Sequence, residues 1–420
     1  MMKRILYISN YQRGLGGINA QVDLLSKHIS AEGYVANIFS TKGNPLKRIW
    51  LFLKLLFVAR KYDMLHMHGC SDWGMVPVVY GVIAGKIWRK RIIVTYHGGG
   101  ADDYFARHGA FARRWLRRAD KVIVLSGFLK KVFNEYDIPC VVIPNVVTLR
   151  EGIYQPKKTI APRFISVRHL TELYRIDLII KAFEQVVKHY PEATLDILGQ
   201  GECRAELEEY VKNKVESGQL KVESVRFVGQ VPNEKIYDYL RANDIMLSAP
   251  RIDNMPVSLL EAMNAGGLVI SSNVGGVPYM IEHGRTGLLF GGTKTQINTA
   301  SADINQKKIN ENTESTAYAA SSVIANQSAN EQDSLQPNCQ SLSTDANELH
   351  LSDSSQKIVS LHSTSKNAEN DLAEALAEQM IWALEHQVES VRMIEAAHEE
   401  VQKYSWHNIK KLLLPLYEQV

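Results

Sequence analysis

The stretch SAPRIDNMPVSLLEAMNAG, residues 248–266, connects two short runs that have the character of buried strands. These runs are Asp244–Leu247 and Leu268–Ser271, and their length and composition are typical of parallel strands. Pro256 suits the first position of a helix and Gly266 suits the residue just beyond its end. The order strand, loop, helix, strand predicts one βαβ unit of a parallel sheet.

The same alternation continues on both sides of this unit. β-rich runs alternate with helical stretches from Arg4 to Val142 and, after a polar break at Arg150–Pro162, from Phe164 to Ser271. We therefore predict two doubly wound α/β lobes, with a ligand site in the cleft between them, beyond the carboxyl ends of the strands. The expected domains are an N-terminal domain, 1–155, and a C-terminal domain, 160–292 with 371–402.

Residues 293–370 break the alternation, because Ser, Asn, Gln, Thr and Ala dominate there. A segment of this composition buries little apolar area, so we predict a low-complexity, disordered insertion in the second lobe. An amphipathic helix is expected to resume at Asp371–His386. Residues 403–420 are expected to form a closing helix, whose leucines need to cover a surface on one of the two lobes.

The charge is unevenly divided. Residues 1–150 hold 23 Lys and Arg against 9 Asp and Glu, a net +14, and since the whole chain carries +3, the remaining residues carry −11. This indicates either a generic solvated basic face or a lobe that faces an anionic membrane surface or a phosphate-bearing acceptor. The apolar run Ile49–Ala59, with basic residues at both ends, is too short to span a bilayer and is either a buried connecting helix or an interfacial one.

Other functions are disfavoured by what the sequence lacks. The four cysteines are far apart without CxxC spacing, and no Asp-x-Asp follows a strand, so we expect no metal site, disulfide framework or bound cofactor. The apolar run Ile5–Ile8 is too short for a signal peptide, so a cytoplasmic protein is expected. Nothing in the sequence indicates nucleic-acid binding.

The carboxylates of residues 248–266 point to a ligand site. A helix that begins right after a loop offers free N–H groups to a diphosphate. Asp253 in the loop and Glu261 inside the helix could reach hydroxyl groups of a sugar and of a ribose. Without further context, a capped helix with a solvated glutamate explains the same pattern.

This region resembles glycosyltransferase family 4, the retaining enzymes of GT-B fold also described as glycosyl transferases group 1. An acidic residue, seven intervening residues and Glu-Ala-Met form the family's donor-site signature, which here begins at Asp253. The resemblance extends through LVISSNVGGVPYMIEHGRTGLLF, residues 268–290, and covers the chain except for 293–370. It implies a GT-B fold of two Rossmann-like domains, the first an acceptor domain and the second a donor-binding domain for a nucleotide sugar. It also implies a closing helix that crosses back to the first domain.

The resemblance also assigns roles to individual residues. The family clamps the donor diphosphate with Arg and Lys, where this chain has His169 and Tyr174, so Arg168 or Arg175 could supply the charge instead. His97, followed by three glycines, matches the histidine near the reacting sugar, whereas His68 is expected to be structural. The catalytic candidates are thus His97 and Asp253, and the donor-binding candidates are Gly16, Gly17, Arg168, His169, Arg175, Gly199, Val231, Asn254, Met255, Pro256 and Glu261. Gly14–Gly17 could equally form a simple turn.

The function implied is a hexosyltransferase-like, metal-independent and retaining glycosyltransferase. Its acceptor would be a lipid or polysaccharide of the cell envelope, and it could lie peripherally on the inner face of the membrane. Two other hypotheses stay open. A sugar-nucleotide 2-epimerase of the same fold would release free nucleotide without an acceptor. A non-catalytic assembly partner with a decayed donor site would fit the altered clamp.

Overall fold

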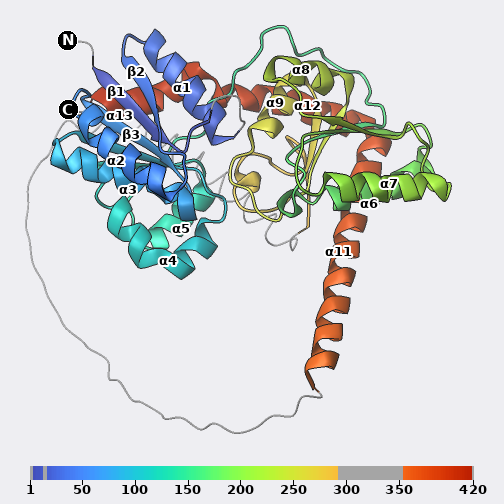
Figure 1. Ribbon diagram of the computed structural model, residues 1–420. Coiled ribbons are helices and arrows are strands. Elements are labelled where there is room, and N and C mark those ends of the chain that lie inside the picture. Colours follow the sequence, from blue (N-terminus) through green and yellow to red (C-terminus); the bar gives the residue numbers. More distant parts are fainter. Residues whose placement is uncertain (1–2, 13–16, 292–352, 419–420) are drawn as a thin grey trace, which may run out of the picture.

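In the computed structural model, the described residues are 3–12, 17–291 and 353–418. They form two lobes, each built on a six-stranded parallel sheet flanked by helices (Figure 1). The predicted fold class of two doubly wound α/β lobes is confirmed. Of the predicted disordered insertion, 293–370, residues 293–352 lie outside the described residues.

The strands are short and mostly buried. All six residues of the strand Met64–Gly69 are buried, as expected where helices cover both faces of a parallel sheet. The first sheet contains β1 Arg4–Ser9, β2 Val35–Ser40, β3 Met64–Gly69, β4 Arg91–Tyr96, β5 Lys121–Val124 and β6 Val141–Val142. The second contains β7 Arg163–Val167, β8 Thr194–Leu198, β9 Val225–Gly229, β10 Ile245–Ser248, β11 Leu268–Ser272 and β12 Leu288–Phe290.

The helices connect consecutive strands, as in other doubly wound folds. Those of the first lobe are α1 Ile18–Ala31, α2 Pro45–Ala59, α3 Val76–Ile87, α4 Ala101–Leu116 and α5 Gly127–Glu135. Those of the second are α6 Ile176–His189, α7 Arg204–Glu216, α8 Asn233–Ala242 and α9 Val257–Ala265. The chain ends with α11 Asp353–Glu385, α12 Gln387–Val401 and α13 Trp406–Glu418.

Each sheet has one point where the strand order reverses. The orders are β2-β1-β3-β4-β5-β6 and β12-β11-β10-β7-β8-β9, so the reversals lie between β1 and β3 and between β7 and β10. At such a point the loops at the carboxyl ends of neighbouring strands leave in opposite directions, which opens space for a ligand. The loops after β7 and β10 are therefore where the second lobe is best able to bind one.

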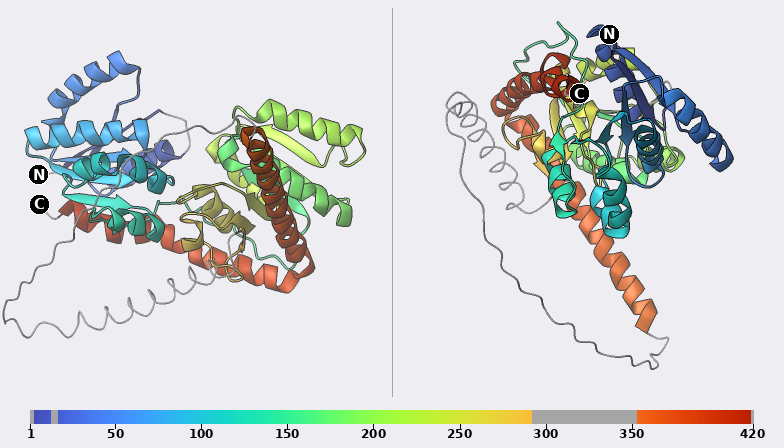
Figure 2. Two further views of the ribbon diagram at one scale, coloured as in Figure 1. Left: turned by 90° about the horizontal axis from the view of Figure 1, so that it is seen from below. Right: turned by 90° about the vertical axis from the view of Figure 1, so that its left-hand side faces the viewer.

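The last helices tie the lobes together (Figure 2). α11 packs against α6, and α12 packs against α9, both in the second lobe. α13 lies on the first lobe, where its Ile409, Leu413 and Tyr417 join the buried cluster of Ile5 and Tyr7. The leucine-rich tail therefore covers the first sheet rather than the second.

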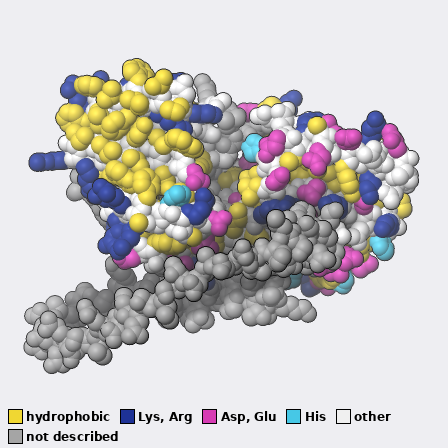
Figure 3. Space-filling view, turned by 60° about the horizontal axis from the view of Figure 1, so that its bottom comes forward, with side chains coloured by type: hydrophobic (Ala, Val, Ile, Leu, Met, Phe, Trp, Pro, Cys, Tyr) yellow, Lys and Arg dark blue, Asp and Glu magenta, His cyan; other side chains and the backbone are white. Residues whose placement is uncertain are grey.

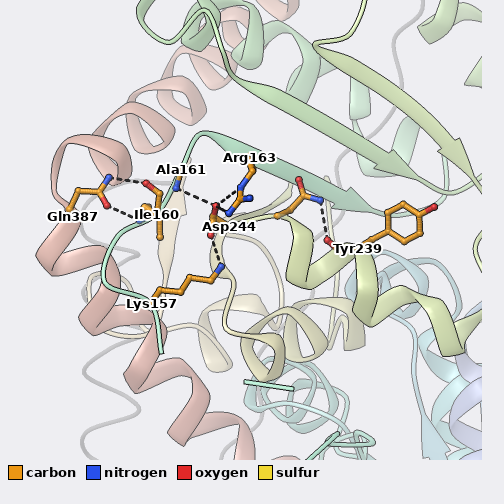
Figure 4. Close-up of polar contacts among 8 residues, drawn as sticks. Lys157, Ile160, Ala161, Arg163, Tyr239, Asp244 and Gln387 are labelled. Atoms are coloured by element: carbon orange, nitrogen blue, oxygen red, sulfur yellow. Dashed lines mark hydrogen bonds and ion pairs between the residues drawn. The ribbon is translucent and has the colours of Figure 1, made fainter. Parts of the chain in front are cut away.

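The segment that joins the lobes is anchored to the second one (Figure 4). Asp244, which is buried, lies 2.6 Å from Lys157 Nζ and 2.8 Å from the Arg163 guanidinium. Gln387 on α12 accepts a hydrogen bond from the Ile160 N–H at 2.7 Å and donates to its carbonyl at 3.2 Å. These bonds hold the chain from residue 157 onward on the second lobe.

Two predicted helix boundaries differ from the structure. Pro256 is the residue before α9 rather than its first residue, because its ψ of 110° is extended. α11 begins at Asp353 rather than at Asp371. Extending an existing helix avoids the cost of nucleation, so a polar sequence can continue the helix that its apolar continuation stabilises.

α2 has apolar side chains on two faces. Leu51, Leu55 and Ala59 are buried against the core of the lobe. On the opposite side, five side chains are 50 to 80% exposed, namely Leu46, Ile49, Trp50, Leu53 and Phe57. Figure 3 shows hydrophobic side chains gathered over this lobe, with Lys and Arg around them. Within the part of the chain that the structure describes, no helix has both the length and the apolar character of a membrane span.

Candidate active site

The ends of β7 and β10 bring an arginine and an aspartate together at the reversal point of the second sheet. Arg168 follows β7, and its Nη1 lies 3.0 Å from Asp253 Oδ2 in the loop after β10. The same guanidinium donates to Ser248 Oγ at 3.2 Å and lies over the Tyr174 ring, 5.1 Å from its centroid. Tyr174, which replaces the lysine that the resemblance led us to expect, thus helps to hold Arg168 in place.

A glycine pair after β11 supports the Asp253 loop. The N–H of Gly276 donates to the Asp253 carbonyl at 2.9 Å. A Cβ atom at Gly275 would lie 2.1 Å from the Asp253 carbonyl oxygen, and one at Gly276 would lie 1.9 Å from that of Asn254. Only glycine permits this approach of two backbones.

The first lobe contributes His97 and the glycines after β4. A Cβ atom at Gly99 would lie 3.2 Å from the Asn254 nitrogen, so this glycine loop touches the Asp253 loop directly. Ser126 Oγ, at the start of α5, donates to Asn254 Oδ1 at 2.5 Å, and Asn254 Nδ2 donates to the His97 carbonyl at 3.5 Å. The two catalytic candidates, His97 and Asp253, therefore lie on touching loops of different lobes.

His97 is neutral in this environment. Burial lowers its pKa to about 3, so the imidazole holds a single proton at physiological pH. Its Nε2 lies 2.9 Å from His68 Nδ1, and the two rings stack with centroids 5.1 Å apart. A neutral imidazole can donate one hydrogen bond and accept another, but it does not supply positive charge to a leaving group.

The amino end of α9 is available to an anion. Its first residues have no side-chain cap, which leaves backbone N–H groups free. Met255, just before it, is held by Asn145, whose Nδ2 donates to the Met255 carbonyl at 3.3 Å and whose N–H points to the Met255 sulfur at 3.1 Å. Asn254, Met255 and Pro256 are all buried, and they position the end of the helix.

Glu261 lies in the middle of α9 beside Tyr237 and Arg150. Desolvation raises the pKa of Glu261 to about 7, and the charge of Arg150 partly offsets this rise. The Arg150 guanidinium lies over the Tyr237 ring, 4.5 Å from its centroid. A carboxylate that is costly to ionise is suited to pairing with hydroxyl groups that satisfy its charge.

Arg175, the other arginine expected at the diphosphate, bonds to backbone carbonyls of the loop after β10. Arg175 is buried, and its Nε donates to the Ala249 carbonyl at 2.9 Å while Nη2 donates to that of Pro250 at 3.4 Å. It has a left-handed backbone, with φ of 45°, at the start of α6. Arg175 thus anchors the loop that leads to Asp253, with Nε and Nη2 bonded to backbone carbonyls.

The remaining donor-site candidates lie at the edges of this region. His169 is exposed beside the Gln200 carbonyl, at 3.3 Å from Nδ1, and Val231 packs against the buried cluster under α9. A Cβ atom at Gly199 would lie 1.8 Å from the Arg168 carbonyl oxygen, so this glycine lets the β7 and β8 loops touch. Gly17 precedes α1 with φ of 62°, whereas Gly16 lies outside the described residues.

Three residues that position the site escaped the sequence reasoning. Ser126, Asn145 and Ser248 each bond to a loop residue or to Arg168, and two of these bonds join residues more than a hundred positions apart. Only the position of Ser126 directly before a helix was a signal, because serine is a common cap. Among the described residues, no three His, Cys, Asp or Glu side chains are grouped so as to hold a metal ion.

Two family models together match most of the chain. Residues 154–321 match the model described as glycosyl transferases group 1, and residues 20–151 match the one described as glycosyltransferase family 4. The two matches correspond to the second and first lobes. Their boundary falls in the segment that joins the lobes.

Comparison with individual proteins also finds glycosyltransferases. The chain is 24% identical over 294 residues to N-acetyl-alpha-D-glucosaminyl L-malate synthase of Bacillus anthracis, covering 65% of this chain and 73% of that protein. It is 33% identical over 147 residues to the amylovoran biosynthesis glycosyltransferase AmsK of Erwinia amylovora, covering 34% of each. The structure of Anabaena HepE in complex with UDP superposes over 100% of both chains, with a TM-score of 0.65 and 15% identity, which shows a shared fold.

Proposed function

The chain belongs to the glycosyl transferases group 1 and glycosyltransferase family 4, and we propose that it moves a hexose from a nucleotide-sugar donor to an envelope lipid or polysaccharide acceptor, with retention of configuration. The observation that carries this proposal is the meeting of the Arg168–Asp253 pair with the His97 loop. A carboxylate of the second lobe, paired with a cation, thus lies on a loop that touches the loop of a neutral imidazole from the first lobe.

Each group has a role in the proposed reaction. Arg168 and the amino end of α9 stabilise the charge that develops on the departing diphosphate, without a metal ion. Glu261 binds the ribose hydroxyls, and Asp253 binds hydroxyls of the donor sugar. His97 lies at the reacting sugar, and front-face attack assisted by the departing phosphate accounts for retention.

Donor binding should depend on the ionisation of Glu261. Because its pKa is raised to about 7, the carboxylate that binds ribose is mostly lost below that pH. Between pH 8 and pH 6 the ionised fraction falls about tenfold, so donor affinity should fall by about the same factor. Calorimetric titration of the donor at a series of pH values measures this change.

Glu261→Gln is the matched control, since it keeps the shape and removes the titration. Its donor affinity should be about tenfold lower than that of the wild type at pH 8 and should vary with pH only as the nucleotide itself titrates.

The pH dependence of stability provides a second check on Glu261. The pKa of Glu261 in the folded protein lies above the ordinary glutamate value of 4.5, so wild-type stability should fall as pH rises from about 4.5 to about 7, and the variant should lack that fall. If donor affinity varies with pH in the same way for the wild type and for Glu261→Gln, Glu261 does not bind the ribose.

The acceptor side is assigned to the first lobe because of the exposed face of α2. Its five exposed apolar side chains are accompanied by Lys47, Arg48 and Lys54 on the same helix. Apolar side chains with surrounding basic ones are the combination that binds an anionic bilayer surface. We therefore propose that this face rests on the cytoplasmic leaflet of a membrane, as a peripheral contact.

This face continues toward the site. Trp73, which is 67% exposed, lies in the turn after β3, and the Arg48 guanidinium of α2 lies over its ring at 4.6 Å. A Cβ atom at Gly98, the residue directly after His97, would lie 3.3 Å from Cys70 Cβ and 3.3 Å from the Ser71 nitrogen, so the two loops are close neighbours. An acceptor held by the membrane would thus meet the glycine loop, which favours a lipid-linked acceptor.

Phe57→Ser should weaken vesicle binding by about tenfold, because burying a large apolar side chain contributes about 1.5 kcal/mol or more. Sedimentation with vesicles that contain anionic lipid measures the loss, and raising the salt concentration should weaken both proteins further. Val222→Ser, which removes an equally exposed apolar side chain from the second lobe, is the control. If both variants bind like the wild type, α2 does not contact the bilayer.

The decisive experiment is incubation with a panel of sugar nucleotides and an envelope-lipid extract, followed by mass spectrometry. A new glycosylated product whose anomeric configuration matches the donor supports the proposal. Release of free nucleotide without any acceptor would instead identify a 2-epimerase. Failure to bind any nucleotide diphosphate in calorimetry would identify a non-catalytic partner.

A further inference from the structure

A row of three histidines, His66 and His68 buried and His97 half-buried, leads from the C-terminal helix to the proposed reaction centre. His66 is fully satisfied, since its Nδ1 lies 2.6 Å from the Tyr417 hydroxyl and its Nε2 lies 2.8 Å from Thr95 Oγ1. The ring centroid of His68 lies 4.6 Å from that of His66, but within the described part of the chain only one of the two ring nitrogens of His68 has a partner. Its Nδ1 pairs with His97 Nε2, but its Nε2 is buried and has no hydrogen-bond partner among the described residues.

The unpaired Nε2 of His68 indicates which ring nitrogens of His68 and His97 carry a proton. Burial keeps the pKa of both His68 and His97 well below the physiological range, so each ring carries one proton. If His97 donated from Nε2, the proton of His68 would lie on its buried Nε2 with nothing to accept it. Buried N–H groups without an acceptor are rarer in proteins than acceptors without a donor. The arrangement in which His68 Nδ1 donates to His97 Nε2 is therefore favoured.

We propose that His68 is a positioning residue that holds His97 as the tautomer protonated on Nδ1. Since Nε2 of His97 is occupied by the bond to His68, Nδ1 is the nitrogen left for a ligand, and the structure gives it no partner among the described residues. His97 then offers a fixed N–H donor to an oxygen atom of the donor substrate. This role rests on the proposed glycosyl transfer, whereas the tautomer itself does not.

The tautomer can be read directly in the whole protein without any substrate. Nitrogen NMR of protein labelled with ¹⁵N-histidine separates protonated from bare ring nitrogens, and the His97 signals are assigned by their loss in His97→Gln. We expect His97 to be protonated on Nδ1 and bare on Nε2, and His68 to be protonated on Nδ1. A proton on Nε2 of His97 would overturn the inference.

Variants of His68 test its role as the positioning residue. His68→Phe keeps the size of the ring but removes the hydrogen bond, so the His97 signals should change to a mixture of tautomers and kcat/KM should fall about tenfold. His68→Asn retains a donor at the same place and should restore kcat/KM to within about twofold. Thr95→Val removes the hydrogen bond to His66 but no bond of His97, so it should change neither the His97 signals nor kcat/KM.

The outcomes separate the two proposals. If no transfer is detected with any donor but the His97 tautomer depends on His68, the proposed function fails and the tautomer assignment stands. If transfer is detected and His68→Phe leaves the His97 tautomer and kcat/KM unchanged, the inference fails and the proposed function stands. If Thr95→Val has the same effect as His68→Phe, His68 acts only through packing, and the inference fails.

Discussion

Arg168→Met is expected to lower kcat/KM for glycosyl transfer by about 10²- to 10³-fold, the loss typical of removing one donor that stabilises charge in a transition state. Arg168 is the described cation that lies at the reversal point of the second sheet with its guanidinium directed to Asp253. The alternative cation, Arg175, is engaged by two backbone carbonyls. Steady-state kinetics measures the change, with the donor and acceptor that the sugar-nucleotide panel identifies.

Arg168→Lys distinguishes charge from geometry. A lysine can keep the ion pair with Asp253 but cannot reproduce the forked contacts of a guanidinium, so an intermediate loss is expected. Lys212→Ala, which removes an exposed cation of the same lobe, should leave kinetics unchanged. Thermal unfolding of each variant shows whether the fold persists. If a folded Arg168→Met retains near-normal kcat/KM, Arg168 is not the residue that stabilises the diphosphate.

The fold was predictable because its signal is periodic and local. Short β-rich runs alternate with helical stretches in both halves, and a polar segment divides them, which is sufficient to indicate two parallel sheets. The glycines of the site were also visible in the sequence. What the sequence does not reveal is that Gly276 and Gly99 approach the same loop, one from each lobe, because this depends on how the lobes meet.

The roles of the arginines were harder to predict for a physical reason. Arg168 and Arg175 lie seven positions apart and carry the same charge, so spacing alone left both as candidates for the diphosphate. Their difference arises from partners distant in sequence. Arg175 meets the carbonyls of Ala249 and Pro250, and Arg168 meets Ser248 and Asp253. Every residue type has a backbone carbonyl, so the type of the partner residue does not indicate such a hydrogen bond. A sequence motif therefore could not reveal the bonds of Arg175.

The Asp253 loop depends on the absence of one side chain, and Gly276→Ala should therefore lower kcat/KM at least about 10²-fold. The added Cβ would lie 1.9 Å from the Asn254 carbonyl oxygen and 2.8 Å from its carbonyl carbon, both backbone atoms that cannot move without the loop. Asn254 bonds to Ser126 of the first lobe, so its displacement also shifts Asp253 relative to His97. A misplacement of about 1 Å at reacting groups is enough for a loss of this size.

The matched control is Gly100→Ala in the glycine loop of the first lobe. A Cβ atom there has no other atom within 4 Å, and the backbone φ of −82° suits alanine. This variant should retain kcat/KM to within about threefold, since replacing a glycine before a helix by alanine costs about 1 kcal/mol at most. Donor binding by calorimetry and thermal unfolding complete the comparison. If Gly276→Ala matches Gly100→Ala in all three measurements, the loops yield easily, and close backbone contact is not what holds Asp253 beside His97.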